Sequence, residues 1–567
     1  MSEIYREASQ VVVWLGEGDA ATAHAFSLLA NIGDLDTLSL ENRPGRDFSV
    51  EAKHRMQGAL HSRARQLLQE AGCASAESDK VGAIFRRSWF YRMWTIQEVI
   101  FASSNKIHVH CGDIAITWLK LVTAVDCLRA IKYAWGGWQN AMRVQSYLTQ
   151  MMILHRFPSA RELTKGNPAN TLQHFDAGVL MVRCREKAAS DPKDKALALY
   201  GLLSELGLPV PRPDYTKSIG DIYAETTAAC IEYDKNLFSL YYVPSDTRRP
   251  GLPSWVPDWS DKGWDEGDTR YPVTRDRFAA SGSSEPKWKI SNDRRRLTVY
   301  GKIIDTVMYC ASSYAMTAPP DIPDMVTRDM YGRLTVSEKL RGIHTIYRTF
   351  KEWIDVSSWA QTYPTGESVG DVVRRTLVND EPRSVAESVH TFGDWFAAIQ
   401  LREEQLTQGM HQRVPGRESS FPVGNGGGGL FARLAGRALS ALERQRDVLE
   451  RRAMGLVDGE ELPIEVRVLL AFAKRPGWRY HSNAIPFSSN KIFFRTAGGF
   501  LGTAPDKIPE PIRSDDQIAV VAGLALPVIL RPDGAGFRLV SHCYLHGVMY
   551  GEAWERVGGR LDEIVLV

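Results

Sequence analysis

The sequence lacks the features that mark secreted, membrane-spanning and disulfide-stabilised proteins. Its seven cysteines are scattered without a C-x-x-C pair, which argues against a disulfide framework and against a structural zinc site. The first residues are charged before any apolar run, so they do not resemble a signal peptide. No stretch approaches the ~18 apolar residues that a membrane span needs. We therefore expect a cytoplasmic protein without a membrane span.

A strong charge of one sign is also missing. The net charge of +2 over 567 residues gives no field that attracts nucleic acid or an anionic membrane. Hydrophobic residues make up 44% and charged residues 24%, which is typical of a folded globular protein. A chain of this length exceeds one hydrophobic core, so we expect several domains and no nucleic-acid partner.

Residues 1–130 alternate between strand and helix patterns, which indicates an α/β arrangement. The run at 11–15 is apolar on both faces, and such a strand usually lies inside a sheet covered by helices. Ser88 is a possible N-cap for the helix that follows it. The expected elements are strands at 11–15 and 106–112 and helices at 20–32, 52–71 and 89–103.

The rest of the chain divides by pattern into a mainly helical middle region, residues 131–290, and a C-terminal α+β region, residues 291–567. Short strands separated by Gly and Pro in the C-terminal region predict a small antiparallel sheet or barrel. The fold class is therefore mixed α/β. The finer expectations are a buried helix at 196–203 opened by Asp191-Pro-Lys-Asp-Lys195, helices at 335–355 and 430–455, and a flexible tract near 409–429.

The expected helix 89–103 carries the best candidate for a functional segment. One stripe of this helix is apolar, and the neighbouring stripe carries Trp94, Gln97, Glu98 and Phe101. A carboxylate flanked by aromatic rings is costly to bury unless it is paired or used. Glu98 therefore needs either a structural partner or a function.

Two interpretations of Glu98 stay open at the level of spacing. In the structural one, Glu98 lies at a domain rim and pairs with an arginine such as Arg87 or Arg92. In the functional one, the carboxylate belongs to a site that also includes Trp94 and Gln97.

Other motifs predict less. Gly424–Gly429 fits G-x-G-x-x-G, but no strand precedes it, so we interpret it as a flexible linker. His108 and His110 share one strand face, and His542 and His546 are four residues apart. Each pair lacks the three or four converging ligands that a metal needs, so we predict no metal site.

Several motifs agree in order and spacing with one family. Together they resemble the fungal heterokaryon-incompatibility (HET) domain proteins over nearly the whole chain. The motifs are Ile4-Tyr-Arg-Glu-Ala8, Val11-Val-Val-Trp-Leu-Gly16, Trp89-Phe-Tyr-Arg-Met-Trp94-Thr-Ile-Gln97-Glu98, Cys111-Gly112, Trp118, Asp191-Pro-Lys-Asp-Lys-Ala196, Tyr200-Gly-Leu202, Pro213-Asp-Tyr215, Pro253-Ser-Trp-Val-Pro-Asp-Trp259, Phe494-Arg-Thr-Ala-Gly-Gly-Phe-Leu-Gly502 and His546-Gly-Val-Met-Tyr-Gly-Glu552.

The resemblance implies a role in non-self recognition and programmed cell death, with the N-terminal module as the effector. The HET domain is similar to the TIR fold, a flavodoxin-like parallel sheet. Several TIR domains cleave NAD with a glutamate in a W-x-x-x-E motif, and Trp94 to Glu98 fits that spacing. The resemblance thus implies Glu98 as the central catalytic residue, Trp94 as packing for the helix or base, Gln97 as a polar neighbour, and NAD as a possible substrate. In such chemistry the carboxylate holds the nicotinamide ribose and stabilises an oxocarbenium-like transition state.

The start of the chain departs from the family pattern. Family members begin with two strands, of patterns Y-x-x-L-S-Y-x-W-G and D-x-x-C-I-N-Q, which do not occur here. We therefore expect residues 1–130 to be an N-terminally truncated HET domain, an incomplete flavodoxin/TIR-like module whose strand at 11–15 lacks sheet neighbours and whose pocket strands are missing. Either the start of the gene is misassigned or part of the domain is lost.

Three functional hypotheses follow from the resemblance. The favoured one is an incompatibility protein that acts through binding to protein partners or self-assembly. The second is a TIR-type NAD glycohydrolase that uses Glu98. The third is an inactive, degenerate paralogue in which Glu98 pairs with arginine.

Overall fold

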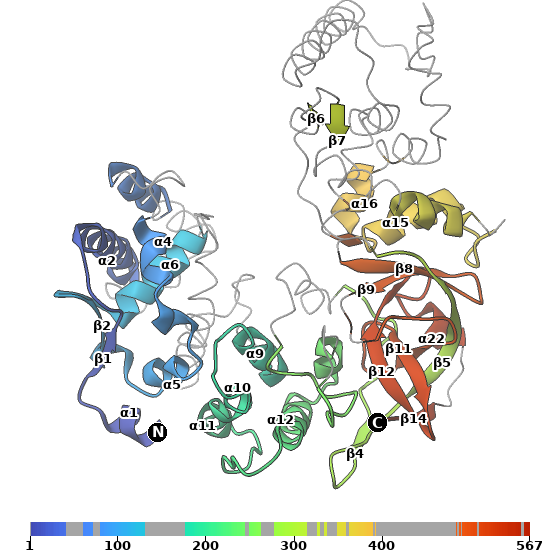
Figure 1. The fold of residues 1–567 in the computed structure, drawn as a ribbon, viewed down its shortest axis with the longest axis horizontal. Coiled ribbons are helices and arrows are strands. Elements are labelled where there is room, and N and C mark those ends of the chain that lie inside the picture. Colours follow the sequence, from blue (N-terminus) through green and yellow to red (C-terminus); the bar gives the residue numbers. More distant parts are fainter. Residues whose placement is uncertain are drawn as a thin grey trace, which may run out of the picture. The chain divides into compact units, whose positions relative to one another are not determined.

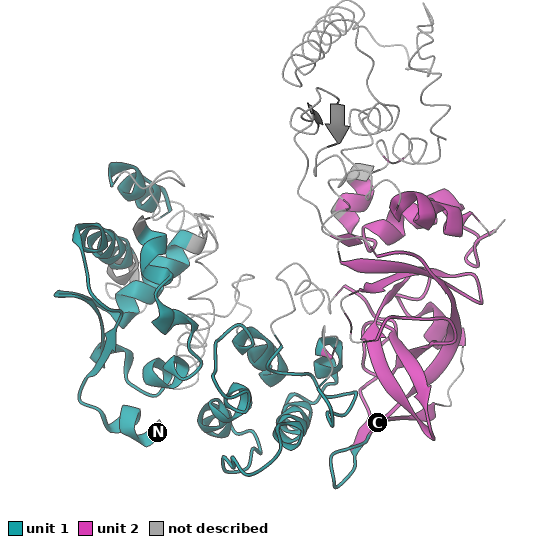
Figure 2. Ribbon diagram, viewed as in Figure 1, with its two compact units in different colours: residues 1–242, 248–265, 290–296 teal, residues 243–247, 266–289, 297–567 magenta. Residues whose placement is uncertain are grey.

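In a computed structural model (Figure 1), the described residues fall into several ranges. Contacts within the chain divide it into two compact units (Figure 2). Unit 1 comprises residues 1–242, 248–265 and 290–296, and unit 2 comprises residues 243–247, 266–289 and 297–567. The domain boundaries at 130 and 290 stay predictions. The described ranges are 2–40, 61–71, 80–130, 176–243, 249–261, 277–313, 326–328, 334–336, 349–358, 362–388, 392, 484, 487–488, 490–506, 508, 510–556 and 561–567.

Unit 1 contains a small sheet of order β1-β2-β3 near its N-terminus. The strand β1 runs parallel to β2, and β2 runs antiparallel to β3. Helices α2 and α6 pack on each other and against this sheet. Both strands predicted in this region are therefore present. The bounds are Val11–Trp14 for β1, Ile107–Cys111 for β2, Ile114–Thr117 for β3, Ala20–Leu40 for α2 and Trp118–Ala130 for α6.

The apolar run of β1 predicts a strand inside the sheet, but β1 lies at one end of it. Among the described residues it pairs with β2 alone and forms one end of the sheet. Val11 and Val13 are buried, whereas Val12 is 54% and Trp14 is 51% exposed. Alternating burial is what a strand shows when a single face is covered. The sheet therefore presents an apolar, exposed strip at β1.

The helix predicted over 89–103 is broken into a 3-10 turn and a short α-helix. Arg92 between them is extended, with φ −80° and ψ 139°. The backbone N–H of Met93 donates to the carbonyl of Ala188 at 2.8 Å, and the N–H of Ala188 donates to the carbonyl of Tyr91. This pairing with a distant segment overrides local helix propensity. Ser88 is not an N-cap but the first residue of the 3-10 turn. The turn is η2, Ser88–Tyr91, and the helix is α5, Thr95–Ile100.

The part of unit 1 after residue 176 is mainly helical. The buried helix predicted over 196–203 consists of two short helices, α10 and α11, whose apolar side chains are buried as expected. The remaining elements of the unit are α1 Ser2–Glu7, a helix at 61–70, α4 Lys80–Phe85, η3 Ser104–Lys106, α9 Ala177–Cys184, α10 Asp194–Leu197, α11 Tyr200–Glu205, α12 Ile219–Asp234 and η5 Phe238–Tyr242.

Unit 2 is built on a β-sheet in which five strands close into a ring. The long strand β5 pairs with β10 on one side and with β14 on the other, and β11 and β12 complete the circuit. Gly301 lies at this double pairing, where a Cβ would collide with the carbonyl of Val520. The strands are β4 Trp288–Ile290, β5 Leu297–Cys310, β8 Lys491–Thr496, β9 Leu501–Pro505, β10 Gln517–Val521, β11 Val528–Asp533, β12 Gly536–His542, β13 Tyr544–Leu545 and β14 Asp562–Leu566.

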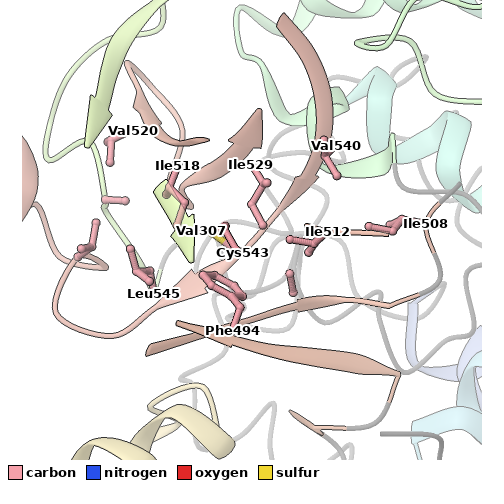
Figure 3. Packing of buried hydrophobic residues seen from close by; sticks show 13 residues of the cluster. Val307, Phe494, Ile508, Ile512, Ile518, Val520, Ile529, Val540, Cys543 and Leu545 are labelled. Atoms are coloured by element: carbon pink, nitrogen blue, oxygen red, sulfur yellow. The ribbon is translucent and has the colours of Figure 1, made fainter. Parts of the chain in front are cut away.

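The interior of this ring is apolar (Figure 3). Side chains from β5, β8, β10, β11, β12 and β13 meet there, and Ile518, Val520 and Ile529 are fully buried. Burial of apolar surface on this scale is the main force that stabilises such a sheet. The predicted β-rich C-terminal region and the mixed α/β class are thus confirmed.

Some expectations for unit 2 are wrong or lie elsewhere. The helix predicted at 335–355 is incorrect at its start, because Leu334–Val336 is the strand β7, although residues 349–357 are helical. The tract near 409–429, with Gly424–Gly429, and the helix at 430–455 lie outside the described residues.

Within the described part of the chain, no helix combines the length and apolarity required to cross a membrane. Other elements are β6 Val326–Arg328, α15 Val369–Leu377, α16 Pro382–Ser388 and α22 Glu552–Arg556.

Candidate functional site

Glu98 has a tryptophan as its hydrogen-bond partner. The indole Nε1 of Trp89 donates to Oε2 of Glu98 at 2.8 Å. Trp89 is buried and packs edge-on against the fully buried Trp118, with ring centroids 5.9 Å apart. The half-buried carboxylate therefore satisfies an indole N–H that burial would otherwise leave without a partner.

Arg87 and Arg92, predicted as partners of Glu98, do not fill that role in the described structure, which contains no ion pair between Glu98 and an arginine. Arg87 instead donates to the backbone carbonyls of Leu15 at 3.4 Å and Glu17 at 3.0 Å. Arg92 is exposed and belongs to the pairing with Ala188. The reason is geometric, because the break at Arg92 turns the chain before α5 begins.

Trp94 faces a different carboxylate. Its Nε1 donates to Oδ2 of Asp194 at 2.9 Å. The other oxygen of Asp194 accepts a hydrogen bond of 2.6 Å from the hydroxyl of Tyr215. Three motifs that are separate in the sequence therefore meet at one carboxylate. These are the Trp89–Glu98 segment, the Asp191–Lys195 turn and the Pro213–Tyr215 segment.

Gln97 is buried and makes one strong contact. Its Nε2 donates to the carbonyl of Ala198 at 2.6 Å. Its Oε1 is buried and has no hydrogen-bond partner among the described residues. A buried acceptor left in this state carries an uncompensated desolvation cost.

Two buried lysines bind backbone carbonyls in and beside the helical region, and one of them reaches η2. Nζ of Lys187 donates to the carbonyl of Phe90 at 2.6 Å, and Nζ of Lys195 donates to the carbonyls of Arg185 and Lys187 beyond the end of α9. Burial lowers the pKa of Lys187 to about 7. Basic groups near a helix C-terminus satisfy its unpaired carbonyls.

The carboxylate of Glu98 influences the pKa of a tyrosine on the helix α1. Burial raises the pKa of the Tyr5 hydroxyl, and the Glu98 carboxylate raises it further. Arg6 on the same helix forms an ion pair of 2.8 Å with Glu205 of α11. The first helix thus links the neighbourhood of Glu98 to the helical region.

The three predicted site residues lie on one short stretch but face different partners. Trp94 and Gln97 are turned to residues 194–198, whereas Glu98 is turned to Trp89. Sequence reasoning identified the motifs but not these pairings. The partners of Trp94 and Gln97 are about one hundred residues away, and the bond between Glu98 and Trp89 depends on the break in the helix at Arg92. The only hint in the sequence is that the Trp89–Glu98 segment carries an indole donor and the Asp191–Lys195 turn carries a carboxylate acceptor.

The histidine pairs do not form metal sites in the described part of the chain, where no three His, Cys, Asp or Glu side chains converge. His108 and His110 lie on β2, next to the exposed Val12 and Trp14 of β1. His542 ends β12 and His546 follows β13, so the pair is not helical.

His546 belongs instead to a hydrogen-bonded network in unit 2. Its two ring nitrogens contact Oε2 of Glu367 at 2.9 Å and the hydroxyl of Tyr544 at 3.0 Å. The hydroxyl of Tyr363 donates to the carbonyl of His546 at 2.9 Å and accepts from the N–H of Leu501 at 3.1 Å. The motifs at 494–502 and 546–552 are therefore joined through residues 363–367.

Comparison with known proteins adds to this geometry. Residues 1–98 match the family described as heterokaryon incompatibility protein (HET). A curated relative, heterokaryon incompatibility protein 6, OR allele, of Neurospora crassa, is 28% identical over 297 residues, which is 46% of this chain and 41% of the relative. The chain thus spans less than half the length of that relative. No solved structure matches the chain.

The match ends at Glu98, the last residue of the motif that resembles the HET family. The N-terminal segment of the chain therefore resembles the heterokaryon incompatibility family. The contacts of Asp194 with Trp94 and Tyr215 join this segment to residues beyond the family match.

Proposed function

We propose that the protein acts in heterokaryon incompatibility, as an effector whose N-terminal module triggers programmed cell death after non-self recognition. The family match over residues 1–98 carries this proposal. The name of the Neurospora crassa relative supports it. Its partners are other proteins of the incompatibility response, or further copies of the chain.

The N-terminal module is proposed to be TIR-like. The parallel pair β1 and β2, with α2 and α6 packed beside the sheet, is consistent with a flavodoxin-like arrangement. The strand β3 is antiparallel to β2, as is common for an edge strand added to a parallel sheet.

Binding or assembly is preferred over catalysis because the predicted site residues are occupied by internal contacts. The N–H donors of Trp94 and Gln97 bind Asp194 and Ala198, and one oxygen of Glu98 binds Trp89. A catalytic carboxylate has to be held ready for the substrate by its surrounding residues. The exposed Val12 and Trp14 on the end strand give an apolar surface of the kind that proteins use for contact.

The alternative is NAD cleavage by Glu98. It is favoured by the W-x-x-x-E spacing of Trp94 and Glu98 and by the partial exposure of the Glu98 side chain. It is tested by nicotinamide release from purified protein, compared with Glu98→Gln. Glutamine keeps an acceptor for Trp89, so a loss of rate reports on the charge and not on folding. Equal rates, or no release by either protein, remove the enzymatic alternative.

The proposed function is tested by expression in a fungal host, with growth and viability as readouts. Killing by the wild-type chain supports the effector role, and absence of killing at high expression contradicts it. Killing that persists in Glu98→Gln supports assembly. An inactive paralogue is the conclusion if neither killing nor nicotinamide release is observed.

A further inference from the structure

One continuous stretch of the helical region forms hydrogen bonds along residues 90–97 of the family motif, which we call the gripped segment. We define residues 187–198 as the strap. Lys187 and Ala188 bind backbone groups of residues 90–93, Asp194 binds the indole of Trp94, and the carbonyl of Ala198 binds the side chain of Gln97. The strap therefore follows the motif from its 3-10 turn into α5.

The two sides of this contact are far apart in the sequence. The gripped residues, 90–97, lie within the segment that the family model matches, and the strap follows about one hundred residues later. The side-chain N–H groups of Trp94 and Gln97 in the gripped segment are both directed into the strap. In the gripped form these side chains are not available to another molecule.

The gripped form also contains unfavourable features. Oε1 of Gln97 is buried without a partner in the described structure. Lys187 is 3% exposed, and burial lowers its pKa because the charge has lost its hydration. A buried acceptor without a hydrogen bond costs free energy while the contact is closed, and opening the contact relieves that cost. The contact between the strap and the gripped segment therefore has a feature expected of a contact that opens.

We propose that the strap is an autoinhibitory contact, which holds the N-terminal module at rest until Trp94 and Gln97 are released. The inference rests on the proposed effector function. Opening exposes the faces of η2 and α5 that the strap covers, and these faces are then free to bind a second copy of the chain. A ligand or partner shifts the protein to the open form by binding that form more tightly.

The test uses full-length protein with Asp194→Ala and, separately, Trp94→Phe, which removes the indole N–H and keeps a ring. Tyr215→Phe is the matched control, because it removes the bond to the other oxygen of Asp194 without touching the gripped segment. Hydrogen–deuterium exchange is measured in peptides covering 88–100, with peptides from 517–545 of unit 2 as the internal reference. We expect exchange about tenfold faster in Asp194→Ala and in Trp94→Phe, which corresponds to the loss of one hydrogen bond to a charged group, and little change in the control.

The same variants are then compared for self-association by light scattering and for killing in the fungal host. Faster exchange with increased association and killing supports the proposal. Unchanged exchange in both Asp194→Ala and Trp94→Phe overturns it, and so does faster exchange without increased killing when the wild-type chain kills. If neither wild type nor variants kill, the effector function fails and the inference fails with it.

Discussion

The indole Nε1 of Trp94 donates a 2.9 Å hydrogen bond to Oδ2 of Asp194, one hundred residues further along the chain. This bond joins the end of the family-matched segment to the helical region that follows. It also gives the tryptophan of the W-x-x-x-E motif a structural role. Changes at residues 187–198 are therefore expected to alter the behaviour of the N-terminal module.

The first prediction concerns Glu98. Glu98→Ala leaves the buried indole N–H of Trp89 without an acceptor, so the free energy of unfolding is expected to fall by about 1–3 kcal/mol. Glu98→Gln keeps an acceptor and is expected to lose less than about 1 kcal/mol. Urea denaturation followed by tryptophan fluorescence measures both. Equal losses in the two variants would contradict the assigned hydrogen bond.

The second prediction concerns Lys187. Burial lowers its pKa to about 7 from 10.5, so the unfolded chain binds more protons than the folded one between these values. The contribution of Lys187 to stability therefore rises with pH from about 7 to 10. Lys187→Met lacks this titration, and the difference in denaturation midpoint between variant and wild type is expected to change with pH. A constant difference across that range contradicts the assignment.

The third prediction concerns Asp234. Its oxygens accept the N–H groups of Ala177 at 2.8 Å and Gly178 at 3.0 Å, at the start of α9. Burial raises the pKa of Asp234, and the neighbouring Asp176 raises it further. Its stabilising contribution is complete at low pH and is lost as the pH rises through the raised pKa. Asp234→Asn cannot titrate.

Thermal unfolding of wild type and Asp234→Asn between about pH 5 and 8.5 checks this sign. We expect the variant to gain stability relative to wild type as the pH rises. A difference that stays constant over that range would contradict the raised pKa, because it would show that the carboxyl is already ionised in the folded protein at pH 5.

The fourth prediction concerns the ring of strands in unit 2. Arg531 binds Asp516 through two bonds of 2.7 and 2.8 Å, and both side chains are buried. Arg531→Met leaves the Asp516 carboxylate without its partner and is expected to cost about 3–5 kcal/mol. Arg538→Met is the control, because Arg538 is partly exposed and its ion pairs are expected to contribute about 0–1 kcal/mol. Similar losses for both variants contradict the difference in burial.

Elements determined by local pattern could be predicted from the sequence. The strands at 11–15 and 106–112 were found because their apolar runs end at Gly16 and Gly112, which have positive φ values. The predicted helix over 89–103 was wrong at Arg92, because backbone pairing with Ala188 depends on a segment far away in the chain.

Long-range pairing also explains what the sequence could not show of the sheet and the site. Closure of the ring depends on β5 pairing with both β10 and β14, more than two hundred residues later. The aromatic stripe around Glu98 was visible in the sequence, but its partner was expected to be Arg87 or Arg92. The structure instead provides Trp89, a neighbour across the break in the helix.

The central claim is that the N-terminal HET-family module acts through binding or assembly rather than through catalysis by Glu98. The most direct measurement is cell death in a fungal host that expresses the full chain at matched levels as wild type or Glu98→Gln. We predict equal killing by the two proteins. Loss of killing in Glu98→Gln, with the variant still folded and the wild type releasing nicotinamide, would contradict the claim.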